Sequence, residues 1–327
     1  MIEDNVYVLG VDGGGSLTRC VVADLSGRLL ARGIAGPSNP MTGGVEASVE
    51  AIIKAVEAAA SRCGVRRFGA ACLGVAGVER PYGRDAIRRG FAARGLSERL
   101  LVVSDAAAAL AGATGGEVGV VVVAGTGSIA YGVNAEGETA RAGGWGWMVG
   151  DEGSGYDIGR RAMAAALRAY DGRGEPTMLA EKVKGALNLG DFRELVDRLY
   201  VTGMKGNEIA SLAPTVAEAA ERGDDVAAHI LRGAGVELGR AAVAVIRRLR
   251  LRGRFTVAQT GGVFQLGGPI RAAFEETVRR AARECIIAPS RFEPAVGAAL
   301  LALRELGVET DEPLLRRVEV SVHNAER

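Results

Sequence analysis

Residues 120–128 read Val-Val-Val-Val-Ala-Gly-Thr-Gly-Ser, and residues 8–16 read Val-Leu-Gly-Val-Asp-Gly-Gly-Gly-Ser. Each stretch is an apolar strand that ends in a turn of small residues. In such a turn the backbone can approach a ligand closely, and its N–H groups can point at a phosphate. Two turns of this kind in one chain indicate one ligand that is bound from two sides.

Two common nucleotide-binding motifs do not fit these turns. The phosphate loop of the form Gly-x-x-x-x-Gly-Lys-Ser/Thr needs a lysine, and the only lysines of the chain are Lys54, Lys182, Lys184 and Lys205. A Rossmann turn leads into a helix, whereas the residues that follow the first glycine run, up to residue 24, alternate as a second strand does. The pattern therefore predicts β-hairpins.

Composition narrows the class of protein. The chain has 327 residues, of which 48% are hydrophobic, so it is long enough for two ordinary domains with a large core. A net charge of +1 gives no basic field, so neither nucleic acid nor a membrane is expected as a partner. With no signal-peptide pattern and no apolar run of membrane-spanning length, a cytoplasmic location is expected.

The cysteines and histidines do not form a metal motif. Cys20, Cys63, Cys72 and Cys285 are far apart in the sequence, and the chain has only two histidines. A zinc site or a disulfide framework is therefore not expected.

The strand pattern occurs twice along the chain, which indicates an internal repeat. The tail after residue 307 carries little signal. Helical spacing predicts helices at about 155–170, 176–187, 190–199, 206–222 and 225–249. We expect one domain over residues 1–112 and about 294–327, and a second over 113–293. The repeated strands are expected at about 6–12, 17–24 and 28–34, and again at 119–123, 128–134 and 139–144.

Five motifs in this order resemble those of N-acetylglucosamine kinases and of the BadF/BadG/BcrA/BcrD-type ATPase family, within the sugar kinase, actin and Hsp70 superfamily. They occur at residues 12–18, 104–109, 124–128, 143–154 and 260–263, and the resemblance covers about residues 6 to 300. It implies an α/β protein with two actin-like (ribonuclease H-like) domains, each a five-stranded mixed sheet with helices, and an active-site cleft between them. It also implies ATP as co-substrate, Mg²⁺, transfer of phosphate to the 6-hydroxyl of a hexose or amino hexose, and a homodimer.

The resemblance assigns the ATP phosphates to the two hairpins. Thr126 would donate its hydroxyl to the terminal phosphate, although an ordinary hairpin turn explains the second motif better when it is taken alone. Asp12 would orient Mg²⁺ through water, and the alternative is a carboxylate that caps its own turn. The expected phosphate-binding residues are Gly13, Gly14, Gly15, Ser16 and Thr18 in the first hairpin and Gly125, Thr126, Gly127 and Ser128 in the second.

Asp105 follows a buried strand and begins an alanine-rich helix. The resemblance makes it the general base that faces the attacking sugar hydroxyl. The alternative is an ordinary helix N-cap, whose carboxylate is occupied by backbone amides.

The resemblance assigns the sugar to Asn39, and the alternative is a turn residue. Carboxylates often accept hydrogen bonds from sugar hydroxyls, an aromatic ring can lie against a pyranose, and a glycine lets a strand end approach the sugar. Asp151, Glu152, Trp145 and Gly77 are therefore further candidates, with helix N-terminal charge as the alternative for the two acids and packing for Trp145. Adjacent residues point in different directions, so one of the two acids could reach the sugar while the other caps the helix.

The remaining motif, Gly261-Gly262, follows the late strand and would bind adenosine. The alternative is a strand-to-helix turn.

Two other functions remain open. One is an ATPase activator or subunit of a 2-hydroxyacyl-CoA dehydratase or benzoyl-CoA reductase system. In the activators, two chains share one iron–sulfur cluster through their cysteines. Cys20 and Cys72 lie in apolar strand patterns, so no iron–sulfur cluster is expected. The other is an actin-like or regulatory nucleotide binder, against which Asn39 and Asp105 argue.

Overall fold

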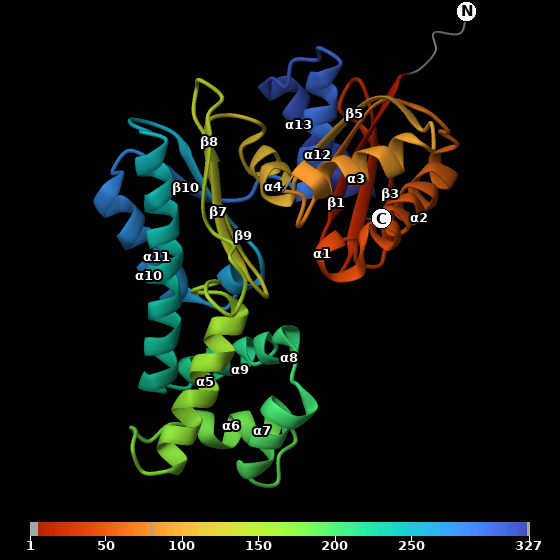
Figure 1. The fold of residues 1–327 in the computed structure, drawn as a ribbon. Helices are drawn as coiled ribbons and strands as arrows, with labels where there is room; N and C mark the ends of the chain where they lie inside the picture. The colour runs from red at the N-terminus through yellow and green to blue at the C-terminus, as the bar shows by residue number, and fades with distance from the viewer. Residues whose placement is uncertain (1–5, 80, 326–327) are drawn as a thin grey trace, which may run out of the picture. The chain divides into compact units, whose positions relative to one another are not determined.

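The computed structural model describes residues 6–79 and 81–325, and its chain divides into two compact units (Figure 1). The first unit contains residues 1–118 and 289–327, and the second contains residues 119–288. The predicted boundaries at residues 113 and 293 lie a few residues outside the second unit.

The first unit is built on a five-stranded mixed sheet with the order β3-β2-β1-β4-β5. β1 pairs antiparallel with β2 and parallel with β4, so the sheet changes direction at β1. The strands are β1 (Tyr7–Gly13), β2 (Thr18–Asp24), β3 (Leu29–Ala35), β4 (Phe68–Val75) and β5 (Ser97–Ser104).

Helices cover both faces of this sheet. Successive residues of a strand point to opposite faces, and here both faces carry apolar side chains. Leu9 and Val11 belong to a core that includes residues of α2 (Val45–Cys63) and α3 (Pro81–Ala92). Val8 belongs to a second core with α12 (Pro294–Glu305), while α4 (Asp105–Thr114) packs against α12. A Cβ at Gly10 would overlap the α12 backbone, so this glycine permits the close approach of helix and sheet.

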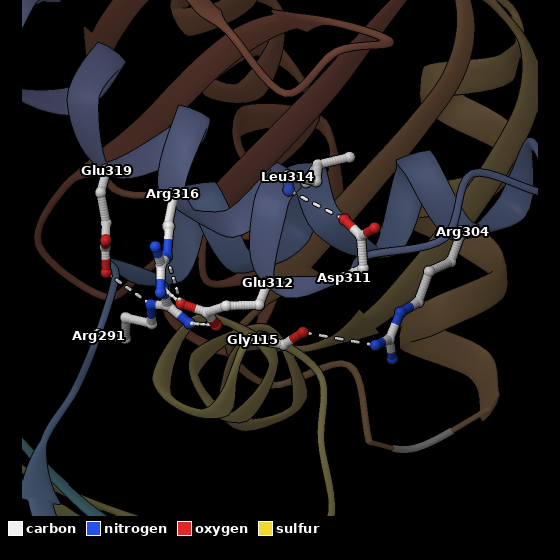
Figure 2. Close-up of polar contacts among 8 residues, drawn as sticks. All are labelled: Gly115, Arg291, Arg304, Asp311, Glu312, Leu314, Arg316 and Glu319. Carbon is white, nitrogen blue, oxygen red and sulfur yellow. Dashed lines mark hydrogen bonds and ion pairs between the residues drawn. The ribbon is translucent and has the colours of Figure 1, made fainter.

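The tail after residue 307 forms a helix, α13 (Glu312–Ala325), which the sequence analysis did not expect. Its buried Leu314, Leu315 and Val318 join the core on the α12 side of the sheet. Arg291 forms ion pairs with Glu312 at 2.8 Å and with Glu319 at 2.6 Å. Figure 2 shows these contacts. In the sequence, the spacing of these three apolar residues indicates a helix, but the arginines between them make the pattern hard to recognise.

The second unit repeats this plan in a sheet with the order β10-β9-β6-β7-β8. β6 pairs antiparallel with β7 and parallel with β9, as β1 pairs with β2 and β4 in the first unit. The strands are β6 (Gly119–Ala124), β7 (Ser128–Val133), β8 (Thr139–Gly143), β9 (Thr256–Thr260) and β10 (Ile286–Pro289). The expected fold class, two five-stranded mixed sheets with helices, is confirmed.

The helices of the second unit are mostly where the spacing predicts them, with one division. The helix expected over 206–222 is two helices, because Pro214 has no N–H to continue the hydrogen bonding. Among the described residues, no helix is long and apolar enough to cross a membrane. The α-helices are α5 (Gly155–Tyr170), α6 (Leu179–Ala186), α7 (Arg193–Asp197), α8 (Gly206–Ala210), α9 (Ala213–Glu221), α10 (Asp225–Arg248) and α11 (Gly268–Ala281); a π-helix at Arg198–Thr202, a 3₁₀ helix at Gly262–Gln265 and, in the first unit, α1 (Pro40–Gly43) complete the fold.

Candidate functional site

The first glycine turn is a tight hairpin between β1 and β2. Gly14 N–H donates to Leu17 O at 3.0 Å, and Gly14 O accepts from Ser38 N–H at 3.0 Å. A Cβ on Gly15 would meet no atom within 4 Å, so the space beside this part of the backbone is open. The loop therefore has the shape that a phosphate-binding turn requires, with a fixed base and an unobstructed tip.

Thr18 differs from the other residues of this turn. Its side chain is fully buried and donates its hydroxyl to Gly36 O at 2.7 Å, and it lies 2.8 Å from Ser38 Oγ. The hydroxyl thus fixes the hairpin to the segment after β3, so the structure gives Thr18 a supporting position and leaves Gly15 and Ser16 exposed.

The strand register brings Asp12 and Asp105 to one edge of the first sheet. Gly13 is paired with Val75, and Val75 with Ser104, so the carboxyl ends of β1, β4 and β5 lie in one row. Burial, and then the neighbouring Asp105 carboxylate, raise the pKa of Asp12 to about 6. Two carboxylates that disfavour each other's ionisation in this way favour a bound cation.

Asp105 is not the N-cap of α4. That position belongs to Ser104, whose Oγ accepts from Ala107 N–H at 3.2 Å. Asp105 Oδ1 accepts from the Ala106 N–H, at 2.9 Å. Burial raises the pKa of Asp105, and backbone N–H groups oppose that rise. A half-buried carboxylate whose pKa lies above the ordinary aspartate value has the character of a proton acceptor.

Asn39 and Gly77 lie against each other in the first unit. Asn39 caps α1, with Oδ1 accepting from Met41 N–H at 2.9 Å. A Cβ on Gly77, whose φ is +78°, would stand 2.6 Å from that same Oδ1. Both readings of Asn39 are therefore compatible, since the capping bond uses the amide oxygen and leaves the amide nitrogen as a donor.

The second glycine turn is supported from behind by the start of α5. Gly125 O accepts from Gly155 N–H at 2.8 Å, and Thr126 O accepts from Tyr156 N–H at 3.2 Å. A Cβ on Gly125 would meet no atom within 4 Å, as at Gly15. The Thr126 side chain is exposed, so its hydroxyl is available to a ligand.

The two adjacent acids after β8 have different surroundings. Asp151 is buried at a φ of 59° and accepts from Ser128 N–H at 3.4 Å, and a Cβ on Gly127 would stand 2.8 Å from its Oδ2. Burial raises the pKa of Asp151, and the Ser128 amide opposes that rise. Glu152 is exposed. The geometry gives Asp151 a position against the hairpin and Glu152 access to solvent.

The two tryptophans also differ. Trp145 is 67% exposed, with the Arg141 guanidinium 4.5 Å from its ring centroid. Trp147 lies 5.3 Å from the Tyr156 ring. Trp147 is 53% exposed, so both rings are accessible, and Trp145 is the more exposed of the two.

Gly261 and Gly262 follow β9 and have separate roles in the backbone. Gly261 has a φ of +102°, and a Cβ there would overlap the Ala124 carbonyl. A Cβ added to Gly262 would meet no atom within 4 Å. Gly261 is thus required for packing beside the second hairpin, and Gly262 leaves the backbone accessible.

Three charged residues near Asp12 were not found by sequence reasoning. Arg19 is the cross-strand partner of Asp12 and lowers its pKa, whereas Glu293, just before α12, raises it. Glu293 is in turn paired with Arg32 on β3. No local motif indicates this cluster, because its members meet only through the sheet and α12.

The donor set fits Mg²⁺ bound together with a nucleotide. Within the described residues, no group of three or more His, Cys, Asp or Glu side chains is arranged to hold a metal. Mg²⁺ commonly takes one or two carboxylates and completes its shell with water and phosphate oxygens. Asp12, with Asp105 beside it, supplies that number.

The four cysteines are free thiols, with no disulfide between them. Cys20, Cys72 and Cys285 are buried. Burial raises the pKa of Cys72 to about 12, as expected for a thiol packed in a core.

Comparison with known proteins agrees with this arrangement. Residues 9–302 match the BadF/BadG/BcrA/BcrD ATPase family. An N-acetylmuramic acid/N-acetylglucosamine kinase of Clostridium acetobutylicum is 36% identical over 91% of this chain and 99% of its own length. An N-acetyl-D-glucosamine kinase of Dictyostelium discoideum is 31% identical over 90% and 97%.

A solved structure shows the same fold. A candidate N-acetylglucosamine kinase from Chromobacterium violaceum superposes with a TM-score of 0.74 at 32% identity, over 91% of this chain and 99% of that one. The fold, the site and these relatives define a phosphotransferase with a hydroxyl group as acceptor. The chain belongs to the BadF/BadG/BcrA/BcrD ATPase family.

Proposed function

We propose that this protein transfers the terminal phosphate of Mg-ATP to the 6-hydroxyl of a hexose or amino hexose. The observation that carries the proposal is the half-buried Asp105 beside Asp12, at the edge of the sheet from which the first glycine hairpin projects. Phosphoryl transfer requires positioned phosphates, neutralised charge and a group that receives the proton of the attacking hydroxyl. The residues of the two units contain each of these parts.

The two hairpins are proposed to bind the phosphates of one ATP. Open space beside Gly15 and Gly125 supports this, because a phosphate oxygen can approach a backbone N–H that no side chain covers. The exposed Thr126 hydroxyl would donate to the terminal phosphate, and Gly261 and Gly262 would face adenosine. Mg²⁺ near Asp12 would neutralise phosphate charge as it develops.

The proposed acceptor is an amino sugar or glucose. The relatives named above act on N-acetylglucosamine or N-acetylmuramic acid, and a glucosamine kinase of Vibrio cholerae is 27% identical over 71% of this chain. Asn39 with its free amide nitrogen, the exposed Glu152 and the Trp145 ring are the groups proposed to meet the sugar, together with Gly77 and Asp151. Asp105 would then take the proton of the 6-hydroxyl.

A panel of sugars tests the assignment. ADP release is measured with N-acetylglucosamine, glucosamine, glucose, N-acetylmuramic acid and no sugar, and each product is weighed by mass spectrometry. We expect a phosphorylated product from at least one of these sugars and none from its 6-deoxy analogue. The same slow ATP hydrolysis with every sugar and without sugar would contradict the kinase assignment.

Thr126→Val removes the hydroxyl group and keeps nearly the same side-chain shape. If this hydroxyl donates to the terminal phosphate, turnover should fall by about tenfold to a hundredfold, the range for a hydrogen bond to a charged group. Sugar affinity, measured by calorimetry without ATP, should change little. Thr139→Val, at an exposed position of the same sheet, is the control and should retain wild-type turnover. An unchanged rate in Thr126→Val would remove this residue from the proposed site.

A further inference from the structure

Positive charge is concentrated in one part of the second unit. Residues 240–283 contain ten arginines and two glutamates, although the net charge of the whole chain is only +1. The segment covers the C-terminal half of α10, β9 and the whole of α11. The net charge of the whole chain therefore does not reveal this strongly basic region, and the composition did not predict it.

A groove between α10 and α11 lies in this region. The helices lie side by side (Figure 1). They approach closely at Gly235, where a Cβ would overlap the Ile270 carbonyl, and at Gly239, where it would stand 2.6 Å from Thr277. C-terminal to Gly239 on α10, the two helices line a groove. The resulting groove has a volume of about 320 Å³.

The groove has a cationic rim and a mostly apolar wall. Its lining contains three guanidinium groups and, among the described residues, no carboxylate. Small or apolar side chains leave the space between the arginines open. The lining residues are Arg240, Val243, Ala244, Arg247, Thr277, Arg280 and Ala281.

Ion pairs within the unit do not use all of this charge. Arg240 pairs with Glu237 at 2.6 Å, and Arg280 pairs with Glu276, and both are exposed pairs within one helix. The guanidinium group of Arg247 forms no ion pair or hydrogen bond with any residue that the structure describes. Guanidinium donors therefore remain available at the groove.

The helix dipole explains part of this arrangement. Arg247 and Arg280 lie in the last turns of α10 and α11, where a cation is favoured by the nearby carbonyl groups. Arg240 lies two turns before the end of α10, where that effect has faded. The same segment of the sequence contains further exposed arginines, which add to the positive charge of this region: Arg248, Arg250, Arg252, Arg254, Arg279 and Arg283.

We propose that the groove between α10 and α11 binds a small phosphorylated anion. Guanidinium groups recognise phosphate through paired N–H donors, and the volume is at the lower end of that of small-molecule sites. The apolar wall formed by Val243, Ala244 and Ala281 suits an organic body attached to the phosphate. The groove contains none of the residues proposed for ATP or sugar, so this binding goes beyond the proposed function.

Adjacent arginines provide a matched test. Arg247 and Arg248 are both exposed and both lie in the last turn of α10, but only Arg247 lines the groove. The whole chain is titrated by calorimetry, without ATP or sugar, with inorganic phosphate and separately with glucose 6-phosphate. Arg247→Met should weaken binding by at least about tenfold, the cost of a lost charged hydrogen bond. Arg248→Met should change it by less than about threefold.

The other outcomes are equally decisive. Tighter binding of glucose 6-phosphate than of inorganic phosphate supports a site for an organic phosphate, whereas equal affinities support recognition of the phosphate group alone. Phosphate bound at the glycine hairpins would be unaffected by either substitution, so equal binding by both variants and wild type overturns the proposal. Equal weakening in both variants indicates a diffuse field and also overturns it. Ala244→Glu, which places a carboxylate in the groove, should reproduce the effect of Arg247→Met.

Discussion

Asp105→Asn should lower turnover by about a hundredfold to ten-thousandfold, the usual cost of a lost general base. The amide cannot take the proton of the sugar hydroxyl, although it keeps the size of the carboxylate. Because Ser104 and not Asp105 caps α4, the helix should be unaffected. Sugar and ATP affinities, measured by calorimetry, should change far less than turnover.

The same assignment predicts the pH dependence of the wild type. Burial raises the pKa of Asp105, so the carboxylate becomes protonated at a higher pH than an ordinary aspartate. Turnover should therefore fall on the acidic side, at a pH above the ordinary aspartate value, and in Asp105→Asn the part of that fall that belongs to Asp105 should be absent.

A matched control separates catalysis from helix structure. Asp225 is the first residue of α10, as Asp105 is of α4, and Asp225 is exposed. Asp225→Asn should retain turnover within about twofold, since exposed substitutions of this kind change little. If Asp105→Asn retained most of its turnover with an unaltered structure, the base would have to be sought at Asp151 or Glu152.

Asp12→Asn should lower turnover by a hundredfold or more and at the same time stabilise the free protein. The loss follows if Asp12 orients Mg²⁺, because an amide is a poorer ligand for a hard cation than a carboxylate. The gain follows from burial, which with Asp105 raises the pKa of Asp12 from 3.8 to about 6. Such a rise means that the ionised form destabilises the fold, by at most about 3 kcal/mol.

The sign of the pH dependence distinguishes this account from a simple loss of folding. The native state holds the Asp12 proton more tightly than the unfolded state, so this residue makes stability fall as pH rises from about 4 to about 6. Urea unfolding of wild type and variant should therefore give equal stabilities near pH 4 and a more stable variant at pH 7. A variant that is less stable than wild type at pH 7 would contradict this prediction.

Much of the fold was determined by local sequence pattern. The hairpins at Gly13–Thr18 and Gly125–Ser128 follow from short-range backbone geometry, and both strand repeats are where alternation places them. Asp105 could also be located at the end of β5 from its neighbours. Helix α13 was not predicted, because its apolar residues can be recognised as buried only once the core that they join is known. The break before Pro214 shows that one absent N–H can interrupt a helix despite helical spacing.

The chemical environment of the site was decided by the tertiary structure. Sequence placed Asp12 and Asp105 at strand ends, but only the β1-β4-β5 order makes them neighbours. Likewise, Asp151 and Glu152 are adjacent in sequence, and the buried turn at Asp151 sends one toward the hairpin and leaves the other exposed. Sequence fixes hydrogen bonds between near residues, whereas burial and charge depend on distant segments that meet, such as Glu293 beside Asp12 and the arginines of α10 and α11.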